Sequence, residues 1–425
     1  MGAGIEKGLT KKFKENISRE EYNIIWIGPE VHDKNNSDFL KELKTLNYIF
    51  LQNTKDAIIL IKDFKFENIC IIIYEKLCKE FIENFEENIN DIYIIPKIIL
   101  LLDNKEKFMN ENKEYINNNP FYFNYMATNL NEIQNIIKNP QKEKNNQEFV
   151  FEYKDMLKLI NMNKDIAFFI QILDNKYSKS NRLSHLINQI KYLDYIPLEL
   201  LSKYFLRIYT EESEFYRDVN MNLQQNKLLY YSPYISVLYE GIKLKSLPVK
   251  SHNILFGSTQ ISKDEFQFLL NKLNNKKENI LTNKIVSKTF LLFTERIDIS
   301  LKFLRRRNKD IISIFFELEK DNNIDLNNIS FSNTTKISAF PNEKEVLFFP
   351  FSSFEIKSIK KKNLDNENIY YKIKLKYLGY NNSSKELLFN SYFSNNDLNK
   401  ELSNKKVIDD QNELKKKLKN LTIKF

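Results

Sequence analysis

The chain is poor in residues that build several common kinds of site. Its 425 residues include 2 Cys, 3 His and 7 Gly. Two cysteines cannot build a disulfide framework, and Cys70 and Cys78 both fall in apolar patterns typical of buried free thiols in a reducing compartment. The histidines are scattered without metal-ligand spacing, so zinc ligation and a His-based triad are not predicted. We therefore expect no metal site.

Long apolar runs and a phosphate-binding glycine loop are also lacking. No apolar run reaches 18 residues, and the longest candidate, residues 92–102, contains Pro96 and Lys97. This run predicts a buried strand rather than a membrane span. Gly28 is the single glycine between residues 9 and 240, which excludes a Gly-rich loop that cradles phosphates in that part of the chain. The N-terminus has no apolar signal-peptide core, and a cytoplasmic location is expected.

The positive charge of the chain is spread out. Lys and Arg number 65 against 56 Asp and Glu, which gives a net charge of +9. Basic residues are interspersed with acidic ones along the chain, apart from one dense cluster at residues 305–307 (RRR) and a basic, diffuse C-terminal tail. We therefore interpret the charge as solvated surface and predict no specific nucleic-acid partner. The basic N-terminal segment, residues 1–21, leaves weak membrane association open. Its start, MGAGIE, partly fits an N-myristoylation pattern but lacks the Ser or Thr at position 6.

Residues 22–140 alternate between predicted strands and helices. Apolar runs predict strands at 23–28, 48–51, 69–74, within 92–102 and at 121–127, and helical spacing predicts helices at 37–46, at 54–61 with Thr54 as cap, after the third strand as far as Phe85, and at 130–137. Strands apolar on both faces favour a parallel sheet covered by helices. The layout resembles a flavodoxin or a response-regulator receiver. Receiver chemistry needs an Asp at the end of the third strand, where Tyr74 and Glu75 stand, so we predict a regulatory or interaction module that is not phosphorylated.

The rest of the chain changes character twice. Residues 139–149 are polar and predict a linker. Residues 150–240 are predicted to be mostly helical, residues 241–380 mostly short strands, and residues 381–425 a polar tail. The predicted strands are 253–256, 285–293, 311–318 and 346–349, followed by a hairpin of 354–359 and 370–377 joined by the turn KKKNLDNEN.

Two carboxylates, Glu343 and Glu345, stand directly before an apolar strand in ISAFPNEKEVLFFPFSSFEI, residues 337–356. Side chains two apart on an extended backbone point to the same side, so both can face one cleft, roughly 6–7 Å apart. Such a pair suits chemistry in which a sugar carbon becomes cationic while a second group attacks it. The alternative interpretation is a solvated turn before a core strand.

This stretch resembles the closing motif of arginine-type mono-ADP-ribosyltransferases, which use NAD as donor. The stretch FYRDVN at 215–220 is similar to a Phe-Tyr-Arg-x-x-Asn stretch in the helical lobe of that family. The resemblance implies an α/β plus α+β chain. Its N-terminal flavodoxin- or receiver-like parallel sheet, residues 22–140, is followed by an ADP-ribosyltransferase-like domain, residues 150–380. That domain comprises a helical lobe, 150–240, and a split β-sandwich, 241–380.

The resemblance also implies roles for the two glutamates. Glu345 would stabilise the oxocarbenium-like ribose and hold its 2′-hydroxyl. Glu343 would orient or deprotonate the attacking group, typically an arginine guanidinium of an acceptor protein. NAD would be the co-substrate, and no metal is implied.

Two further elements of the family are altered in this chain. The family's Tyr-Arg-Gly element, which contains its NAD-binding Arg, maps onto the stretch that ends Phe256-Gly257-Ser258. If Gly257 matches the glycine, Phe256 stands in place of the Arg; in the register shifted by one, Phe256 matches the Tyr and Gly257 takes the place of the Arg. Neither register supplies an arginine. Lys243, Lys245 or Lys250 could replace that cation, although Lys lacks the bidentate fork of Arg. The Ser-x-Ser element maps onto residues 292–294, where Thr294 supplies the last hydroxyl and Leu292 replaces the first.

We therefore predict an NAD-dependent protein mono-ADP-ribosyltransferase. The catalytic residues would be Glu345 and Glu343, and the cofactor-binding residues would be Gly257, Phe256, Ser258 and Thr294. The altered elements keep a second interpretation open, a catalytically silent homologue that binds a nucleotide or a protein. A basic adaptor that assembles through the N-terminal domain is the third.

Overall fold

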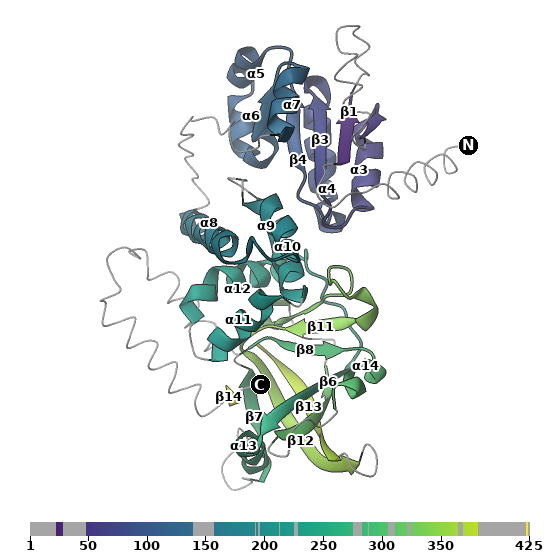
Figure 1. The fold of residues 1–425 in the computed structure, drawn as a ribbon, viewed down its shortest axis with the longest axis vertical. Coiled ribbons are helices and arrows are strands. Elements are labelled where there is room, and N and C mark those ends of the chain that lie inside the picture. Colours follow the sequence, from purple (N-terminus) through teal and green to yellow (C-terminus); the bar gives the residue numbers. More distant parts are fainter. Residues whose placement is uncertain are drawn as a thin grey trace, which may run out of the picture. The chain divides into compact units, whose positions relative to one another are not determined.

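The computed structural model describes residues 23–28, 48–138, 157–191, 193, 196–211, 213–224, 228–274, 283–287, 289–304, 311–320, 324, 326–363, 369–380 and 422–423. The chain divides into two units, residues 1–204 and 205–425 (Figure 1). The predicted helix at 37–46, the N-myristoylation pattern and the arginine cluster at 305–307 lie outside the described residues. No helix in the described ranges is both long enough and apolar enough to cross a membrane.

The first unit contains a parallel sheet of five strands in the order β2-β1-β3-β4-β5. The strands are β1 (Asn23–Ile27), β2 (Tyr48–Leu51), β3 (Ile69–Tyr74), β4 (Lys97–Leu101) and β5 (Tyr125–Ala127). The five predicted strands and their parallel pairing are confirmed. β5 is shorter than predicted because residues 120–123 form a 3-10 turn, η4 (Pro120–Phe123). The strand order is one of the two common orders of doubly wound sheets.

Helices cover this sheet (Figure 1). They are α3 (Thr54–Lys62), η2 (Glu75–Leu77), α4 (Cys78–Glu87), η3 (Ile89–Asp91), α5 (Lys105–Glu111), α6 (Lys113–Asn118) and α7 (Leu130–Lys138). α3 and α4 pack against each other, and α7 packs Ile133 and Ile136 against a cluster that includes Trp26. The predicted cap of α3 is wrong. Asn53 is the N-cap, because its side chain accepts from the Asp56 amide at 2.9 Å, whereas the Thr54 hydroxyl donates to Glu80.

The first unit also includes α8 (Leu157–Tyr177), α9 (Ser184–Ile190) and the start of α10 (Leu198–Thr210). The Lys203 side chain is fully buried in this unit, where its ammonium group donates to the carbonyl oxygens of Ile89 at 2.7 Å and Ile92 at 2.6 Å. These bonds satisfy a charge that would otherwise be costly to bury. The predicted helical lobe started at residue 150, whereas the helices up to residue 204 fall in the first unit. The predicted domain limits stay a prediction.

The second unit contains a curled mixed sheet in the order β10-β11-β8-β6-β9-β13-β12-β7-β14. The strands are β6 (Ile254–Ser262), β7 (Lys284–Ser287), β8 (Leu291–Thr294), β9 (Ile311–Glu319), β10 (Phe331–Asn333), β11 (Glu345–Phe348), β12 (Ser352–Asn363), β13 (Ile369–Tyr380) and β14 (Thr422–Ile423). The β12–β13 hairpin is confirmed. Residues 285–293 were predicted as one strand and form two, β7 and β8. Strands β10, β11 and β8 form one part of the sheet, and they join the other part where Phe256 of β6 pairs with Thr294 of β8.

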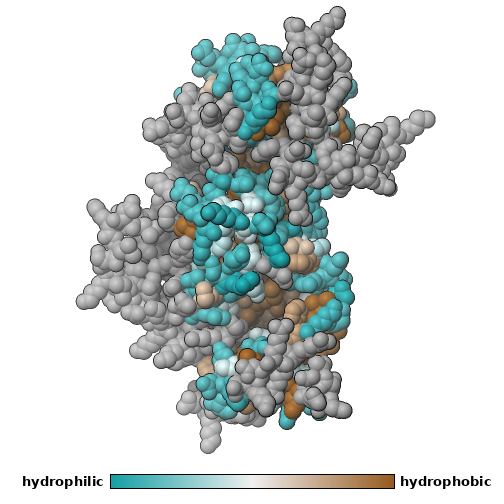
Figure 2. Space-filling model, viewed as in Figure 1, coloured by the Kyte–Doolittle hydropathy of each residue, from teal (hydrophilic) through white to brown (hydrophobic). Residues whose placement is uncertain are grey.

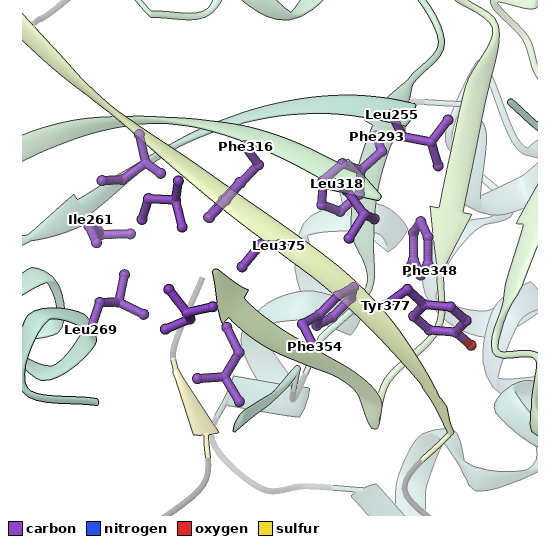
Figure 3. Packing of buried hydrophobic residues seen from close by; sticks show 14 of the residues in the cluster. Leu255, Ile261, Leu269, Phe293, Phe316, Leu318, Phe348, Phe354, Leu375 and Tyr377 are labelled. Atoms are coloured by element: carbon purple, nitrogen blue, oxygen red, sulfur yellow. The ribbon is translucent and has the colours of Figure 1, made fainter. Parts of the chain in front are cut away.

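Aromatic side chains fill the core of this sheet. Phe293 of β8, Phe348 of β11 and Tyr377 of β13 point toward one another in Figure 3. The ring centroids of Phe293 and Phe348 lie 5.2 Å apart, as do those of Phe348 and Tyr377. The Tyr377 hydroxyl is satisfied inside the core, since it accepts from the Ser330 amide at 2.8 Å. This core joins β11, which begins with Glu345, to both parts of the sheet.

Helices and turns complete the second unit. They are the end of α10, α11 (Glu214–Gln224), α12 (Leu228–Lys243), α13 (Lys263–Asn274), α14 (Ile297–Lys302), η5 (Leu326–Asn328) and η6 (Pro341–Glu343). Tyr209 of α10 packs on Phe290 with ring centroids 4.6 Å apart, and Phe290 packs on Phe349. Aromatic stacking thus attaches the end of α10 to the segment that follows β11. Of the predicted tail, only Thr422 and Ile423 are described, and they pair with β7.

Candidate functional site

The two glutamates of the sequence motif do not lie on one strand. Glu345 is the first residue of β11, whereas Glu343 ends the 3-10 turn η6. Lys344 between them is left-handed, with φ 47° and ψ 50°, a conformation that costs a non-glycine residue roughly 1–2 kcal/mol. The prediction that both acids lie on extended backbone is therefore wrong. Both nevertheless line one cavity.

The end of β8 holds the Glu343 turn in place. The Thr294 hydroxyl donates to the Glu343 carbonyl at 2.5 Å and accepts from the Arg296 amide at 3.0 Å. The Arg296 guanidinium donates to the Asn342 carbonyl at 3.1 Å and pairs with Asp298. The Glu295 amide donates to the Lys344 carbonyl at 3.1 Å. This set of bonds explains how an unfavourable left-handed lysine is maintained.

A second segment, residues 334–338, surrounds Glu345. The Thr334 amide and hydroxyl both donate to the Glu345 backbone carbonyl, at 2.9 and 3.0 Å. The Ser338 hydroxyl donates to Oε2 of the Glu345 carboxylate at 3.2 Å. Glu345 also pairs across the sheet with Thr294. Its backbone and its half-buried carboxylate are therefore held by separate donors.

The cavity has a volume of about 570 Å³, within the usual size range of small-molecule sites. It lies entirely in the second unit, and all six predicted site residues line it: Phe256, Gly257, Ser258, Thr294, Glu343 and Glu345. The structure thus brings together residues that are almost ninety positions apart in the sequence. Their roles stay predictions.

The β6 residues of the cavity are occupied in packing. A Cβ atom added to Gly257 would lie 3.0 Å from ring atoms of Phe293, so glycine allows β6 and that ring to approach closely. Phe256 stacks on Phe315 with ring centroids 6.0 Å apart. The Ser258 hydroxyl donates to the Ser300 carbonyl at 2.7 Å. An aromatic ring therefore stands on β6 where the resemblance led us to expect a guanidinium.

The cavity also includes residues from α10 and α11 that were not predicted as site residues. These are Tyr209, Thr210, Tyr216 and Arg217. Arg217 is exposed, and it is the one Lys or Arg among the described residues that line the cavity; the three lysines considered as replacements, at 243, 245 and 250, do not line it. The stretch FYRDVN was a signal that could have identified Tyr216 and Arg217.

Tyr209 provides a neutral, fixed part of the cavity wall. Burial raises the pKa of its hydroxyl well above the ordinary value, and neighbouring Tyr216 adds to this effect. The hydroxyl accepts from the Asn220 side chain at 2.8 Å, and the rings of Tyr209 and Tyr216 lie 5.0 Å apart. Tyr209 is thus un-ionised at neutral pH.

Apolar side chains are exposed around the cavity. Phe303, just after α14, is 64% exposed and Phe340, just before η6, is 36% exposed, and both line the cavity. Leu292 is also exposed there. Figure 2 shows hydrophobic residues on the viewed face of the second unit. Exposed aromatic residues beside a cavity are typical of a surface that receives another molecule.

The cavity has the composition of an organic-ligand site. Its polar groups are two carboxylates, a few hydroxyls and one guanidinium, placed among aromatic and aliphatic side chains. Within the described ranges, no group of three or more His, Cys, Asp or Glu side chains could hold a metal ion.

No family model matches this chain, and no curated protein does. Solved structures that it resembles include the ADP-ribosyltransferase Vis in complex with an inhibitor, with 16% sequence identity and a TM-score of 0.31 over 52% of this chain and 85% of that chain. The ADP-ribosyltransferase HopU1 of Pseudomonas syringae has 13% identity and a TM-score of 0.31 over 51% of this chain and 97% of that one.

A third resemblance is to exoenzyme S from Pseudomonas aeruginosa, in complex with human 14-3-3 protein beta and bound to Carba-NAD. Its identity is 14% and its TM-score 0.31, over 50% of this chain and 88% of that one. Identities and TM-scores this low do not show what the chain does.

Proposed function

We propose that the second unit is an NAD-dependent protein mono-ADP-ribosyltransferase. The observation that carries this proposal is the composition of one cavity, in which two carboxylates, a guanidinium and aromatic rings from distant segments line the same space. The resemblance of residues 337–356 and 215–220 to arginine-type members of that family supports the same activity.

On the side of the NAD donor, the reaction needs an ionised carboxylate and does not need a general acid. Nicotinamide is a cation in NAD, so its ring nitrogen leaves with the glycosidic electron pair and needs no proton. The barrier lies in the positive charge that develops at the ribose C1′, and a fixed carboxylate stabilises that charge. Glu345 fits this role because its backbone and its carboxylate are both anchored.

The acceptor side needs a base near the attacking group. A guanidinium nitrogen of an acceptor arginine would attack C1′, and its proton would pass to a carboxylate. Glu343 fits this role, since it lines the same cavity from a separately braced turn. The products would be nicotinamide, an ADP-ribosylated side chain and a proton.

Arg217 is suited to the pyrophosphate of the donor. A guanidinium can form two parallel hydrogen bonds to phosphate oxygens, and an arginine that has such a partner is held by charge as well as geometry. Tyr216 beside it offers a ring face for stacking. Arg217 would thus provide from α11 the cation that Phe256 of β6 does not.

Exposed aromatic residues at the cavity support a protein as the acceptor. Phe303 and Phe340 lie at the cavity with 64% and 36% of their surfaces exposed. Leaving such side chains in water is unfavourable, and an apolar surface of an acceptor protein would cover them. The acceptor residue would then enter the cavity beside Glu343.

For the first unit we propose a receiver-like regulatory role without phosphorylation. Its strand order matches that of flavodoxin-like sheets. At the carboxyl end of β3 the Tyr74 hydroxyl donates to Asp103 at 3.0 Å, and the Asp103 amide donates to Glu75 at 3.1 Å. The Asp103 carboxylate at this edge thus accepts from a phenol, and the Glu75 carboxylate accepts from a backbone amide.

One observation favours a catalytically silent alternative. Phe256 is stacked on Phe315 where the family carries its NAD-binding arginine, and Leu292 replaces a hydroxyl. Losing a charge-assisted contact costs on the order of 2–4 kcal/mol, or roughly 30- to 1000-fold in affinity or rate. The unit would then bind a nucleotide or a protein without turnover.

The test compares the full chain with Glu345→Gln. Both proteins would be incubated with NAD labelled in the adenylate and with agmatine as an arginine analogue. Nicotinamide release and label transfer would be measured. We expect release by the wild type and a loss of about 10²–10³-fold in the variant. NAD-dependent thermal stabilisation without nicotinamide release would support a silent homologue that binds NAD. Neither NAD binding nor nicotinamide release would reject both the transferase and that NAD-binding homologue.

A further inference from the structure

Ser338 lies within the motif at residues 337–356, but the resemblance assigned it no role. Ser338 lies in the loop between β10 and η6 and is 5% exposed. Its Oγ donates to Oε2 of Glu345 at 3.2 Å and accepts from the Phe340 amide at 3.0 Å. Because the amide can only donate, it fixes Oγ as its acceptor, which leaves the single hydroxyl proton to point at the carboxylate.

The loop that carries Ser338 is itself held from α10. The Arg207 guanidinium donates to the Ile337 carbonyl at 3.1 Å, and the Ala339 amide donates to the Thr210 hydroxyl at 3.4 Å. The Ser338 amide donates to the Thr334 carbonyl at 2.7 Å. The residues on both sides of Ser338 are therefore fixed, and its hydroxyl is supplied at a defined place.

Among the β8 residues that line the cavity, Thr294 alone carries a hydroxyl. Thr294 and Leu292 are two apart on β8 and face the cavity, opposite Glu345 and Leu347 of β11. The Thr294 hydroxyl is directed to the Glu343 carbonyl, and Leu292 has no hydroxyl. The Ser338 hydroxyl, which donates to the Glu345 carboxylate, comes from a different segment, the loop after β10.

We propose that Ser338 is a positioning residue that holds the Glu345 carboxylate in its reactive orientation. This proposal rests on the proposed transferase function for its kinetic consequence, although the hydrogen bond itself can be tested without turnover. Ser338 would act through Glu345 and would not touch the substrate. By donating a hydrogen bond, the Ser338 hydroxyl would also favour the ionised form of the Glu345 carboxylate, which is the form that stabilises a cationic ribose.

Other charged and titratable groups around Glu345 enter the interpretation of a pH experiment. Glu343 lies on the neighbouring turn, Arg217 lines the cavity from α11, and Tyr209 and Tyr216 line it from α10 and α11. None of these is altered by a change at Ser338. A shift that follows Ser338 alone therefore reports on the hydroxyl.

The kinetic experiment compares Ser338→Ala with Ser332→Ala in the full chain. Ser332 is a matched control, since it is also buried and its hydroxyl donates to a backbone carbonyl, that of Pro248 at 3.3 Å. We expect kcat to fall about tenfold in Ser338→Ala with KM for NAD within twofold of wild type, and no change in Ser332→Ala. The acid limb of the kcat profile should move to higher pH in Ser338→Ala, because losing a donor raises the pKa of Glu345. Equal kcat and an unmoved limb in an active enzyme would overturn the proposal.

A measurement of the Glu345 pKa without substrate separates this proposal from the transferase function. Glutamate labelled with ¹³C at the carboxyl carbon would be incorporated in the full chain, and the Glu345 signal identified as the one lost in Glu345→Gln. We expect its pKa to rise by about one unit in Ser338→Ala and to stay constant in Ser332→Ala. An unchanged pKa would reject the role of Ser338 even if the chain had no activity. If Ser338→Ala does not fold, Ser338→Cys replaces it, since a thiol is a similar-sized but weak donor.

Discussion

Two sets of residues line the cavity, and they are built differently. The carboxylate set is Thr294, Glu343 and Glu345, and the β6–α11 set is Phe256, Ser258 and Arg217. The carboxylate set is held by hydrogen bonds to its backbone as well as to its side chains. In the β6–α11 set, Phe256 and Ser258 are engaged with Phe315 and Ser300, while Arg217 is exposed.

This difference indicates that a fixed position matters more for the carboxylates than for the cation that would bind phosphate. A carboxylate that stabilises a short-lived cation gains from being held before the reaction, because no reorganisation is then needed. A phosphate contact tolerates a mobile cation, since charge attraction varies slowly with distance. A relocated guanidinium is therefore easier to accommodate than a displaced glutamate.

Glu345→Gln apart, the largest effect is expected in the carboxylate set from Glu343→Gln. Under the proposed function this change removes the base for the acceptor but leaves Glu345 in place, so transfer to agmatine should fall about 100-fold while NAD hydrolysis persists. Product analysis by chromatography separates ADP-ribose from ADP-ribosylagmatine. Glu295→Gln is the control, because Glu295 is an acid next to β8 that does not line the cavity, and the change leaves its backbone amide, which donates to Lys344, in place. Parallel loss of transfer and hydrolysis would show that the two glutamates have no separate roles.

A smaller effect is expected in the β6–α11 set from Arg217→Ala. Loss of a charge-assisted phosphate contact should raise KM for NAD about 30-fold with little change in kcat. Adding Phe256→Arg in the same chain should recover part of this loss, because it returns a guanidinium to β6. Lys302→Ala is the control, because Lys302 is an exposed cation on α14 that does not itself line the cavity. An unchanged KM in Arg217→Ala would mean that the donor does not contact α11.

The smallest effect is expected at the junction of the two sets, from Gly257→Ala. The added Cβ would lie 3.0 Å from the Phe293 ring, so that ring or β6 would have to shift slightly, at a cost of about 1–2 kcal/mol in the free energy of unfolding. Urea denaturation measures this cost. Phe293→Leu in the same chain should relieve most of it, and additive costs of the two changes would contradict the proposed contact.

Periodicity accounts for what the sequence predicted well. The strands of the first unit are apolar on both faces, so β1, β3 and β4 stood out as continuous runs, and their parallel pairing followed. Residues 285–293 were predicted as one strand because both ends are apolar, although residues 288–290 connect β7 to β8. The cap of α3 was assigned to Thr54 because Asn53 and Thr54 are both good cap residues, and only the backbone geometry distinguishes them.

The candidate site was predictable in part for a similar reason. Glu343 and Glu345 are adjacent to a strong strand signal, and Thr294 and Gly257 stand in strands that periodicity also marks. The turn at Glu343 was missed, because a left-handed Lys344 is stabilised by Glu295 and Arg296, which are about fifty positions away in the sequence. Arg217 was missed because its place in the cavity depends on how α11 packs.

The sequence by itself determined the elements with a regular apolar pattern, such as β1, β3 and β4, because such a pattern decides which backbone form buries the apolar residues. It also determined that two acids precede a core strand. The tertiary structure alone decided which side chains meet. The Ser338 hydroxyl reaches Glu345, and Thr294 reaches the Glu343 turn, through contacts across a folded sheet. Such contacts depend on the distance between segments in space, which no local pattern of residues encodes.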